Sequence, residues 1–501
     1  MAGSNPGVSF GQCLTNVARA RPDDADLIVV ARDGSERAVT WRELETRANQ
    51  IGRSFAAHGV GKNDVVMIAL PNCLDHILAT LATWKLGATV LPARHDLPQW
   101  EMDRLLDIAL PVVLVSDSHG LDGRSSERGA VVTTDDLASS SALPDGELEN
   151  SVSECVNLIA SSGSTGTPKL IVSPRRGVVA HDPEVTYSHH SATRILVTSP
   201  LYHGNGFNNA APPLLKGSRS IVMEKFDASL AVRLIEKHQI DYTVMVPTML
   251  QRIARLEDVR PEQLASLETL IYGGARIPEW LVDRWLELVP PEVFNFAYGS
   301  SEGLGAVRMT GLDWADHRGS TGRPVDVTIS IRDDEGNQLP VGEVGQVFMR
   351  PLDPNRRLFS YIGIPTPAPT ADGFRTIGDL GSVDADGYLY IADRRTDLIV
   401  TGGANVFPAE VEAALSEHPG VIDQVVVGVP DDDWGHRVHA IIQPSDTSNP
   451  PTAEDLRAHC KQRLASYKAP KTYELVERVP RNEAGKLNRT KLGAERGAEL
   501  G

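Results

Sequence analysis

Short apolar runs alternate with amphipathic helical patterns through the first 300 residues of the chain. Thr40 and Glu43 have the spacing of a capping box, and a helix is predicted from there to Gly59. The apolar residues that recur in it at helical spacing are Leu44, Ala48, Ile51 and Phe55. Residues 65–70, VVMIAL, form the continuous apolar run that is typical of a buried strand.

Similar units follow along the chain. A second helix is predicted over 74–86, and strands over 88–91, 112–115, 192–198, 220–223, 241–246 and 269–272. Buried strands separated by amphipathic helices predict an α/β fold whose parallel sheets are covered on both faces. No fixed period of 20–50 residues is present, which argues against a solenoid.

Changes in composition and in the hydrophobic pattern indicate how the chain is divided into domains. Residues 120–150 are rich in Ser, Gly and Asp, and we expect an exposed excursion or linker there. From about residue 329, short strands with Gly and Asp turns indicate a small β-rich subdomain, and from 399 the pattern returns to α+β. We therefore predict an N-terminal domain over 1–393 and a small C-terminal domain over 398–501, divided at 394–397.

Composition narrows the class of protein. The 501 residues are 41% hydrophobic with a net charge of −17, which argues against a nucleic-acid or anionic-membrane partner. The four cysteines form no CxxC pair, and neither a signal peptide nor an 18-residue apolar run is visible. We expect a cytoplasmic protein with reduced thiols and no membrane insertion. Residues 457–496 carry 11 basic and 4 acidic side chains, typical of a solvated face or of a surface that meets a polyphosphate.

The strongest local signal is the loop SSGSTGTPK from Ser161 to Lys169. It follows a strand-like stretch, and its glycines let backbone N–H groups and hydroxyls converge on phosphate oxygens. Pro168 before the lysine excludes a Walker A loop. A flexible surface loop is the other interpretation of these residues.

Further motifs follow in order. They are YGSSE over 298–302, Gly378-Asp379, TGGANVFPAE over 401–410 and PRNEAGK over 480–486. Together with the Ser/Gly loop, this set resembles the class I adenylate-forming superfamily: acyl-CoA synthetases, luciferases and the adenylation domains of peptide synthetases. The resemblance extends from Trp41 to Lys486 with the motifs in family order. The run over 393–412 also looks like the branch that activates bile-acid, steroid and terpenoid acids.

The resemblance implies a site for ATP and Mg²⁺. Phosphates would be bound by Ser162, Gly163, Ser164, Thr165, Gly166, Thr167, Lys169 and Ser301, with Thr165 counted among the catalytic residues. Gly273, Gly274 and Ala275 would lie against adenine, with Tyr298 stacked on its other side. Asp379 and Arg394 would hold the ribose, and Glu302 would bind Mg²⁺ and act in catalysis.

The same resemblance implies a two-step reaction with a moving C-terminal domain. Lys486 would stabilise the charge that develops during adenylation, a task for which a compact ammonium is suited. The domain would then turn about a hinge at Thr396 and Asp397. Gly402 and Gly403 would admit the thiol of CoA, and Lys468 belongs to the basic face that would attract its phosphates.

The resemblance places the acyl pocket around a catalytic His203. The acyl residues would be Tyr202, His203, Asn205, Gly299, Ser300 and Gly303. No aspartate stands near His203 to pair with a substrate amine, so we expect a carboxylic acid without an α-amino group. Four glycines (Gly204, Gly206, Gly303 and Gly305) leave room beside the adenylate, which predicts a bulky polycyclic acid.

The sequence thus predicts an AMP-forming acyl-CoA synthetase that uses ATP, Mg²⁺, CoA and a small-molecule carboxylic acid. Alternatives remain open. They are a medium- or long-chain fatty or aryl acid CoA ligase, an enzyme that loads a carrier protein, a luciferase-like mono-oxygenase, and a non-catalytic nucleotide-binding relative. The sequence does not fix the oligomeric state, a homo-oligomer included, or whether the pathway is catabolic or part of secondary metabolism.

Overall fold

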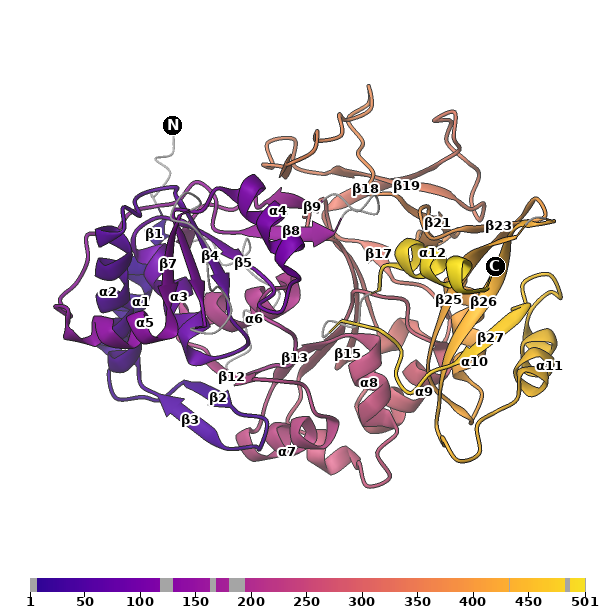
Figure 1. Ribbon diagram of the computed structural model, residues 1–501, viewed down its shortest axis with the longest axis horizontal. Coiled ribbons are helices and arrows are strands. Elements are labelled where there is room, and N and C mark those ends of the chain that lie inside the picture. The colour runs from indigo at the N-terminus through magenta and orange to yellow at the C-terminus, as the bar shows by residue number, and fades with distance from the viewer. Residues whose placement is uncertain are drawn as a thin grey trace.

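The computed structural model describes residues 7–117, 129–162, 168–179, 194–431, 433–482 and 487–500 (Figure 1). A four-stranded parallel sheet, in the order β5-β4-β6-β7, forms the core of the first part. Its strands are β4 (Val65–Ala69), β5 (Thr89–Pro92), β6 (Val113–Ser116) and β7 (Ala130–Thr133). The helices of this part are α1 (Phe10–Ala20), α2 (Trp41–Ala57), α3 (Leu74–Lys85), α4 (Gln99–Ala109) and α5 (Thr134–Ser139), followed by the 3₁₀ turn η2 (Ser140–Ala142).

A nine-stranded sheet occupies the middle of the molecule, in the order β17-β16-β15-β14-β13-β11-β12-β2-β3. The six strands from β15 to β2 are parallel. At one side β16 and then β17 are added by antiparallel pairing, and at the other side β3 pairs antiparallel with β2. The strands are β2 (Leu27–Val30), β3 (Glu36–Val39), β11 (Arg194–Val197), β12 (Arg219–Met223), β13 (Tyr242–Met245), β14 (Thr269–Tyr272), β15 (Phe294–Tyr298), β16 (Val307–Thr310) and β17 (Arg323–Pro324).

Helices cover both faces of the nine-stranded sheet. One apolar cluster joins α1, α2, α3 and α6 (Gly204–Leu214) to strands of both parallel sheets, so these helices lie between the sheets. A second cluster packs α7 (Ala228–His238), α8 (Pro247–Ala254) and α9 (Glu279–Leu288) on the other face, with η4 (Pro261–Leu264) and η5 (Gly311–Asp313) beside them. The α/β class and the parallel sheets predicted from the sequence are confirmed.

Three smaller sheets complete this part of the chain. An antiparallel sheet, β18-β19-β21-β22, is formed by β18 (Val327–Arg332), β19 (Gly345–Pro351), β21 (Asp379–Val383) and β22 (Leu389–Arg394). The connection between β19 and β21 contains β20 (Ser360–Ile362). This strand pairs with β9 (Pro168–Val172), which in turn pairs with β8 (Leu158–Ser162). Two short strands, β1 (Val8–Ser9) and β10 (Val178–Val179), form the last pair.

The last sheet contains only strands that follow residue 398. Its order is β24-β23-β26-β25, with β27 parallel to β26. The strands are β23 (Ile399–Thr401), β24 (Ala404–Val406), β25 (Val421–Asp431), β26 (Gly435–Pro444) and β27 (Thr472–Leu475), covered by α10 (Pro408–Ser416), α11 (Ala453–Arg463) and α12 (Arg489–Leu500). None of the described helices is long and apolar enough to cross a membrane.

The predicted linker over 120–150 is wrong over residues 130–142, whereas residues 143–150 are irregular and mostly exposed as expected. Residues 118–128 lie outside the described residues, but the run Ala130-Val131-Val132 forms β7, which pairs with β6. Thr133 caps the helix that follows, through a reciprocal capping box with Asp136. The polar composition around this short strand hid it, because only Val132 of the strand is fully buried.

Candidate active site

The predicted ribose-binding residues meet at the edge of two sheets. Tyr298 ends β15, and its hydroxyl donates a hydrogen bond to Asp379, the first residue of β21, at 2.6 Å. Arg394, the last residue of β22, lies opposite Asp379 in the β21–β22 ladder, with 3.4 Å between its Nε and Oδ1 of Asp379. Burial raises the pKa of Asp379, although Tyr298 and Arg394 act against the rise. The three side chains form one connected polar group.

A second polar group lies around Glu302. This carboxylate is buried, and its Oε1 accepts a hydrogen bond from the Tyr361 hydroxyl at 2.8 Å. Lys169 places its ammonium 3.4 Å from the same oxygen and 3.8 Å from the centre of the Tyr361 ring. Burial alone would raise the pKa of Glu302, but Tyr361 and Lys169 outweigh burial and hold that pKa below its usual value.

This arrangement fits a divalent cation bound with ATP. Glu302 is a buried carboxylate that already faces one cation, the Lys169 ammonium. Mg²⁺ prefers one or two carboxylates together with phosphate oxygens and water. No group of three or more His, Cys, Asp and Glu side chains gathers in the described part of the chain.

The predicted adenine segment follows β14 at the carboxyl edge of the parallel sheet, where α/β folds bind ligands. Gly274 has a φ of +90°, a conformation that favours glycine. A Cβ on Gly273 would lie 3.0 Å from the carbonyl oxygen of Ala297, so the chain after β14 passes close to β15. Ala275 is exposed beside them.

His203 precedes α6, and its ring lies 4.5 Å from that of Tyr202. A Cβ on Gly204 would lie 3.5 Å from Oγ of Ser301, so the start of α6 faces the YGSSE segment. Gly303 has a φ of +64° with open space around it, and its N–H donates to the carbonyl oxygen of Ser300 at 3.0 Å, which closes the turn that follows Gly299. The structure therefore brings the predicted acyl residues of both segments together.

Two of the four glycines that predicted a wide acyl pocket do not provide space. A Cβ on Gly206 would lie 2.1 Å from the carbonyl oxygen of Pro200, and one on Gly305 would lie 2.0 Å from Val327. Both glycines allow protein atoms to pack closely, which corrects that argument. Of the four, Gly303 alone adjoins open space, and a Cβ on Gly204 would make ordinary contacts with Ser301 and Asn208.

The first turns of α6 are polar. Asn205 donates to the Ser199 hydroxyl at 3.1 Å, and Asn209 donates to the Asn205 side chain at 2.8 Å. On the neighbouring face, Arg175 donates to Asn208 at 2.6 Å. The helix thus presents amide groups, in addition to apolar side chains, near the predicted acyl site.

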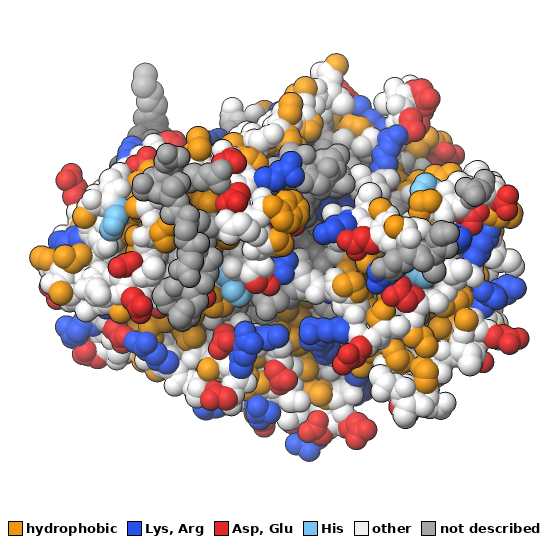
Figure 2. Space-filling view, viewed as in Figure 1, with side chains coloured by type: hydrophobic (Ala, Val, Ile, Leu, Met, Phe, Trp, Pro, Cys, Tyr) orange, Lys and Arg blue, Asp and Glu red, His pale blue; other side chains and the backbone are white. Residues whose placement is uncertain are grey.

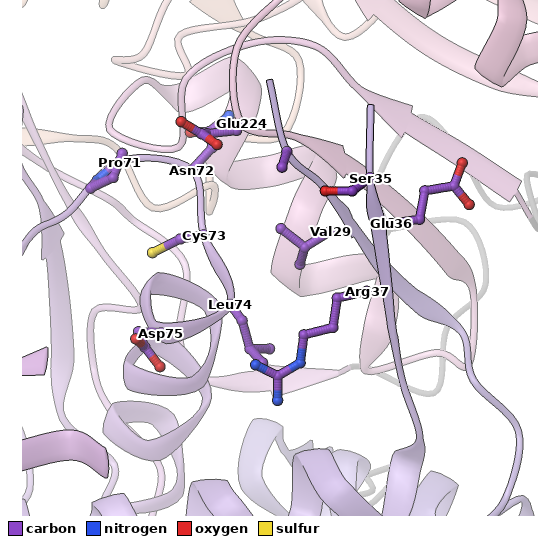
Figure 3. A pocket seen from close by; sticks show the side chains of 11 residues that line it. Val29, Ser35, Glu36, Arg37, Pro71, Asn72, Cys73, Leu74, Asp75 and Glu224 are labelled. Carbon is purple, nitrogen blue, oxygen red and sulfur yellow. The ribbon is translucent and has the colours of Figure 1, made fainter. Parts of the chain in front are cut away.

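Asn72 fixes the loop that carries His203. Its amide donates to the carbonyl oxygens of Ser199 at 3.1 Å and Met223 at 3.0 Å, and its Oδ1 accepts from the Leu201 N–H at 2.7 Å. These buried bonds tie the chain after β4 to the ends of β11 and β12. Asn72 also lines a surface pocket of about 360 Å³, together with Arg37, Asp75 and Glu224 among others (Figure 3).

The predicted hinge is tied to α12. Thr396 is exposed, whereas Asp397 accepts a hydrogen bond from Arg489 at 2.9 Å. Arg489 also donates to both carboxylate oxygens of Glu412 on α10. Next to this group, Asp393 accepts from the N–H of Ala409 at 3.0 Å.

The Gly402-Gly403 turn joins β23 to β24, with φ values of +56° and +81°. A Cβ on Gly402 would lie 2.4 Å from the Trp434 ring, and Lys471 places its ammonium 3.6 Å from the centre of that ring. Gly403 faces open space. In Figure 1, β23 lies at the right-hand side, away from the end of β15 in the middle of the molecule.

Much of the basic segment is neutralised by acidic side chains of its own domain. Lys468 pairs with Glu410 at 2.7 Å, and the other pairs are Arg463–Glu417, Arg481–Asp423, Arg489–Glu412 and Arg496–Glu474. Figure 2 shows charges of both signs on the C-terminal part of the molecule, at the right. Lys and Arg side chains lie near a recess at the centre of the view. The basic surface is therefore smaller than the charge count indicated.

Several predicted residues lie outside the described part of the chain. They are Gly163, Ser164, Thr165, Gly166, Thr167 and Lys486. Ser162 ends β8 just before the loop, and Ser301 is exposed beside Glu302. Their assigned roles stay predictions, as do those of the residues placed above.

Sequence reasoning missed Tyr361, Asn72, Trp434 and Arg489. Tyr361 belongs to a three-residue strand, and nothing in its neighbourhood indicates that it returns to Glu302. Asn72 and Arg489 each lie within three residues of a feature that was noted, the strand over 65–70 and Lys486. An isolated polar residue directly after a buried strand was the available signal for Asn72.

Comparison with known proteins identifies the family. Residues 14–351 match the model of the AMP-binding enzyme family, and residues 410–486 match that of the AMP-binding enzyme C-terminal domain. The chain belongs to the AMP-binding enzymes.

Its relatives agree with that assignment. A feruloyl-CoA synthase from Amycolatopsis sp is 32% identical over 90% of this chain and 92% of its own. A fatty acid–[acyl-carrier-protein] ligase from Streptomyces coeruleorubidus is 30% identical over 91% of each. The solved structure of o-succinylbenzoate coenzyme A synthetase from Bacillus subtilis with ATP and magnesium ion has a TM-score of 0.77, at 26% identity, over 96% of this chain and 98% of that one.

Proposed function

We propose that this protein is an AMP-forming acid–CoA ligase. It adenylates a carboxylic acid with ATP and releases pyrophosphate, then transfers the acyl group to the thiol of CoA and releases AMP. The observation that carries the proposal is the convergence of Tyr298, Asp379 and Glu302 at the edge of the parallel sheet, within a chain of the AMP-binding family. The feruloyl-CoA synthase and the o-succinylbenzoate coenzyme A synthetase support CoA as the acceptor.

The residues have distinct tasks in the first step. Asp379 and Arg394 hold the ribose, and Tyr298 both stacks on adenine and fixes the Asp379 carboxylate. Mg²⁺, when bound to Glu302 and ATP, neutralises phosphate charge. The Ser162–Lys169 loop holds the phosphates and Lys486 stabilises the charge that develops on the α-phosphate, so catalysis is mainly positioning and electrostatics.

The second step needs another orientation of the C-terminal domain. Because β23 lies away from the end of β15, the Gly402-Gly403 turn cannot admit a thiol to the adenylate in the arrangement of Figure 1. We propose that the domain turns about Thr396 and Asp397. Lys471, whose ammonium lies over the exposed Trp434 ring, is then better placed than the paired Lys468 to attract the CoA phosphates.

We propose an aryl carboxylic acid without an α-amino group as the substrate class. The argument for a polycyclic acid rested on four glycines, and protein atoms occupy the space beside two of them. Asn205 and Asn209 give the start of α6 polar groups that suit the substituents of an aromatic ring.

Acid-dependent exchange of labelled pyrophosphate into ATP tests this function. A panel of hydroxylated cinnamic and benzoic acids, octanoic acid and a steroid carboxylic acid should be compared by kcat/KM, because that ratio measures discrimination. We expect the aryl acids to lead. Adding CoA or a carrier protein then identifies the acceptor, and a lead for the steroid acid would restore the polycyclic class.

A further inference from the structure

Tyr361 reaches the active site from a distant part of the chain. It is the middle residue of β20, and it lies opposite Ile171 in an antiparallel pair with β9. Strand β9 carries Lys169 and follows the phosphate loop. The long connection between β19 and β21 therefore lays one tyrosine along the edge of the hairpin that is proposed to bind phosphate.

Two different parts of Tyr361 contact two functional side chains. The hydroxyl donates to Oε1 of Glu302 at 2.8 Å. The ring lies under the Lys169 ammonium, whose nitrogen is 3.8 Å from the ring centre and 3.4 Å from the same Glu302 oxygen. Half-buried Tyr361 is also held by its neighbour Phe359, at 5.0 Å between ring centres.

We propose that Tyr361 is a positioning residue for the proposed metal ligand and for the loop lysine. Its hydroxyl fixes the Glu302 carboxylate before Mg²⁺ arrives, which lowers the cost of ordering that ligand. Its ring holds Lys169 beside Glu302 through a cation–π contact, so that the lysine moves only a short way when phosphate binds. This inference rests on the proposed function, because Glu302 and Lys169 have their roles only in an ATP-dependent enzyme.

The two parts can be separated by substitution. Tyr361→Phe removes the hydroxyl and keeps the ring, whereas Tyr361→Leu removes both and leaves a shorter apolar side chain. Tyr390→Phe is the matched control, because the Tyr390 hydroxyl also donates to a carboxylate, Asp384, at 3.0 Å, on the surface of the small β-rich sheet.

The experiment measures binding of ATP by titration calorimetry, with EDTA and over a series of Mg²⁺ concentrations. For Tyr361→Phe we expect the Mg²⁺ concentration for half-maximal tightening of ATP binding to rise about 10- to 150-fold, the range for a lost hydrogen bond to a charged group, with ATP affinity in EDTA unchanged. For Tyr361→Leu we expect the same rise and a further loss of about two- to fivefold in EDTA. Tyr390→Phe should match the wild type in both.

The outcomes separate the two proposals. If the wild-type protein does not bind ATP, the proposed function fails. If it binds Mg·ATP and Tyr361→Phe has the wild-type Mg²⁺ dependence, or needs less Mg²⁺, the positioning role is wrong. Equal thermal unfolding of Tyr361→Phe and Tyr390→Phe shows that a shift in Mg²⁺ dependence does not come from a general loss of stability.

Discussion

Arg489 donates a hydrogen bond to Asp397 at 2.9 Å, which ties the first residue of α12 to the chain just beyond β22. The same guanidinium donates to both carboxylate oxygens of Glu412, and all three side chains are largely buried. The segment proposed to turn as a hinge is therefore anchored on the C-terminal side by a buried ion-pair network. Thr396, by contrast, is exposed, and its one contact with the network is a hydrogen bond from its hydroxyl to Asp397 at 3.3 Å.

Removing the guanidinium should destabilise the C-terminal domain strongly. Arg489→Ala leaves Asp397 and Glu412 buried without their cation, a change that costs about 3–5 kcal/mol. Arg463→Ala, which breaks the exposed pair with Glu417, should cost less than about 1 kcal/mol and is the control. Urea unfolding followed by tryptophan fluorescence measures both, and equal losses would contradict the anchoring role.

His76 predicts how stability depends on pH. Its ring is fully buried in α3 and hydrogen-bonded to the carbonyl oxygen of Leu70, and burial lowers its pKa from 6.5 to about 4. Between these values the unfolded chain binds a proton that the folded chain does not, so the free energy of unfolding falls as the pH falls. At pH 5 the loss from this group is about 2 kcal/mol. It is complete below about pH 4.

The test compares urea unfolding of wild type and His76→Gln at about pH 7.5 and pH 5. The variant keeps a donor for Leu70 but does not titrate, so its stability should change less with pH than that of the wild type. His58→Gln removes an exposed histidine and should leave the wild-type dependence unchanged. Identical pH dependence of wild type and His76→Gln would refute this account.

Substitution of Asn72 should raise KM for the acid more than KM for ATP. Asn72→Ala removes the three hydrogen bonds that fix Ser199 and Leu201 ahead of His203, so we expect KM for the acid to rise about tenfold and KM for ATP to change less than about twofold. Asn72→Asp keeps the acceptor for Leu201 but sets a carboxylate oxygen against the carbonyl oxygens of Ser199 and Met223, so it should raise KM for the acid at least as much as Asn72→Ala. A merely structural role would lower kcat or the yield of folded enzyme and move both KM values together.

Lys471 and Lys468 make a matched pair for CoA. Lys471→Ala should raise KM for CoA about three- to tenfold, an effect that weakens at high salt, because its ammonium lies over the exposed Trp434 ring. Lys468→Ala should change KM for CoA less, since Glu410 already neutralises that charge. Pyrophosphate exchange should be unchanged in both. If Lys468→Ala raises KM for CoA more than Lys471→Ala does, Lys468 and not Lys471 contacts CoA.

Local pattern predicted much of the fold, and long-range contacts limited the rest. The apolar run at 65–70 and the helix after Thr40 are found as expected, in β4 and α2. Burial of a strand and capping of a helix depend on residues that are close together in the sequence, so a local pattern reveals them. The class of the fold followed from that alternation. Strand β7 was hidden because a short edge strand buries few side chains.

The candidate site shows the same division. Tyr298, Asp379 and Glu302 lie in recognisable motifs, and the structure brings them to one edge. Tyr361 and Asn72 act through hydrogen bonds to residues 59 and 127 positions away, which no local pattern records. Gly206 and Gly305 misled the pocket argument because a glycine provides space only where no other atom has taken it.

The most direct test of the central claim follows the two half-reactions in wild type and Lys486→Ala. The wild type should exchange pyrophosphate into ATP only when an acid is present, and with CoA it should form AMP and acyl-CoA in equal amounts. Lys486→Ala should lose exchange by more than about 100-fold, the scale of one electrostatic stabiliser, yet still convert a supplied acyl-adenylate and CoA to the thioester. Release of ADP and phosphate, acid-independent exchange, or equal loss of both half-reactions in the variant would contradict the account.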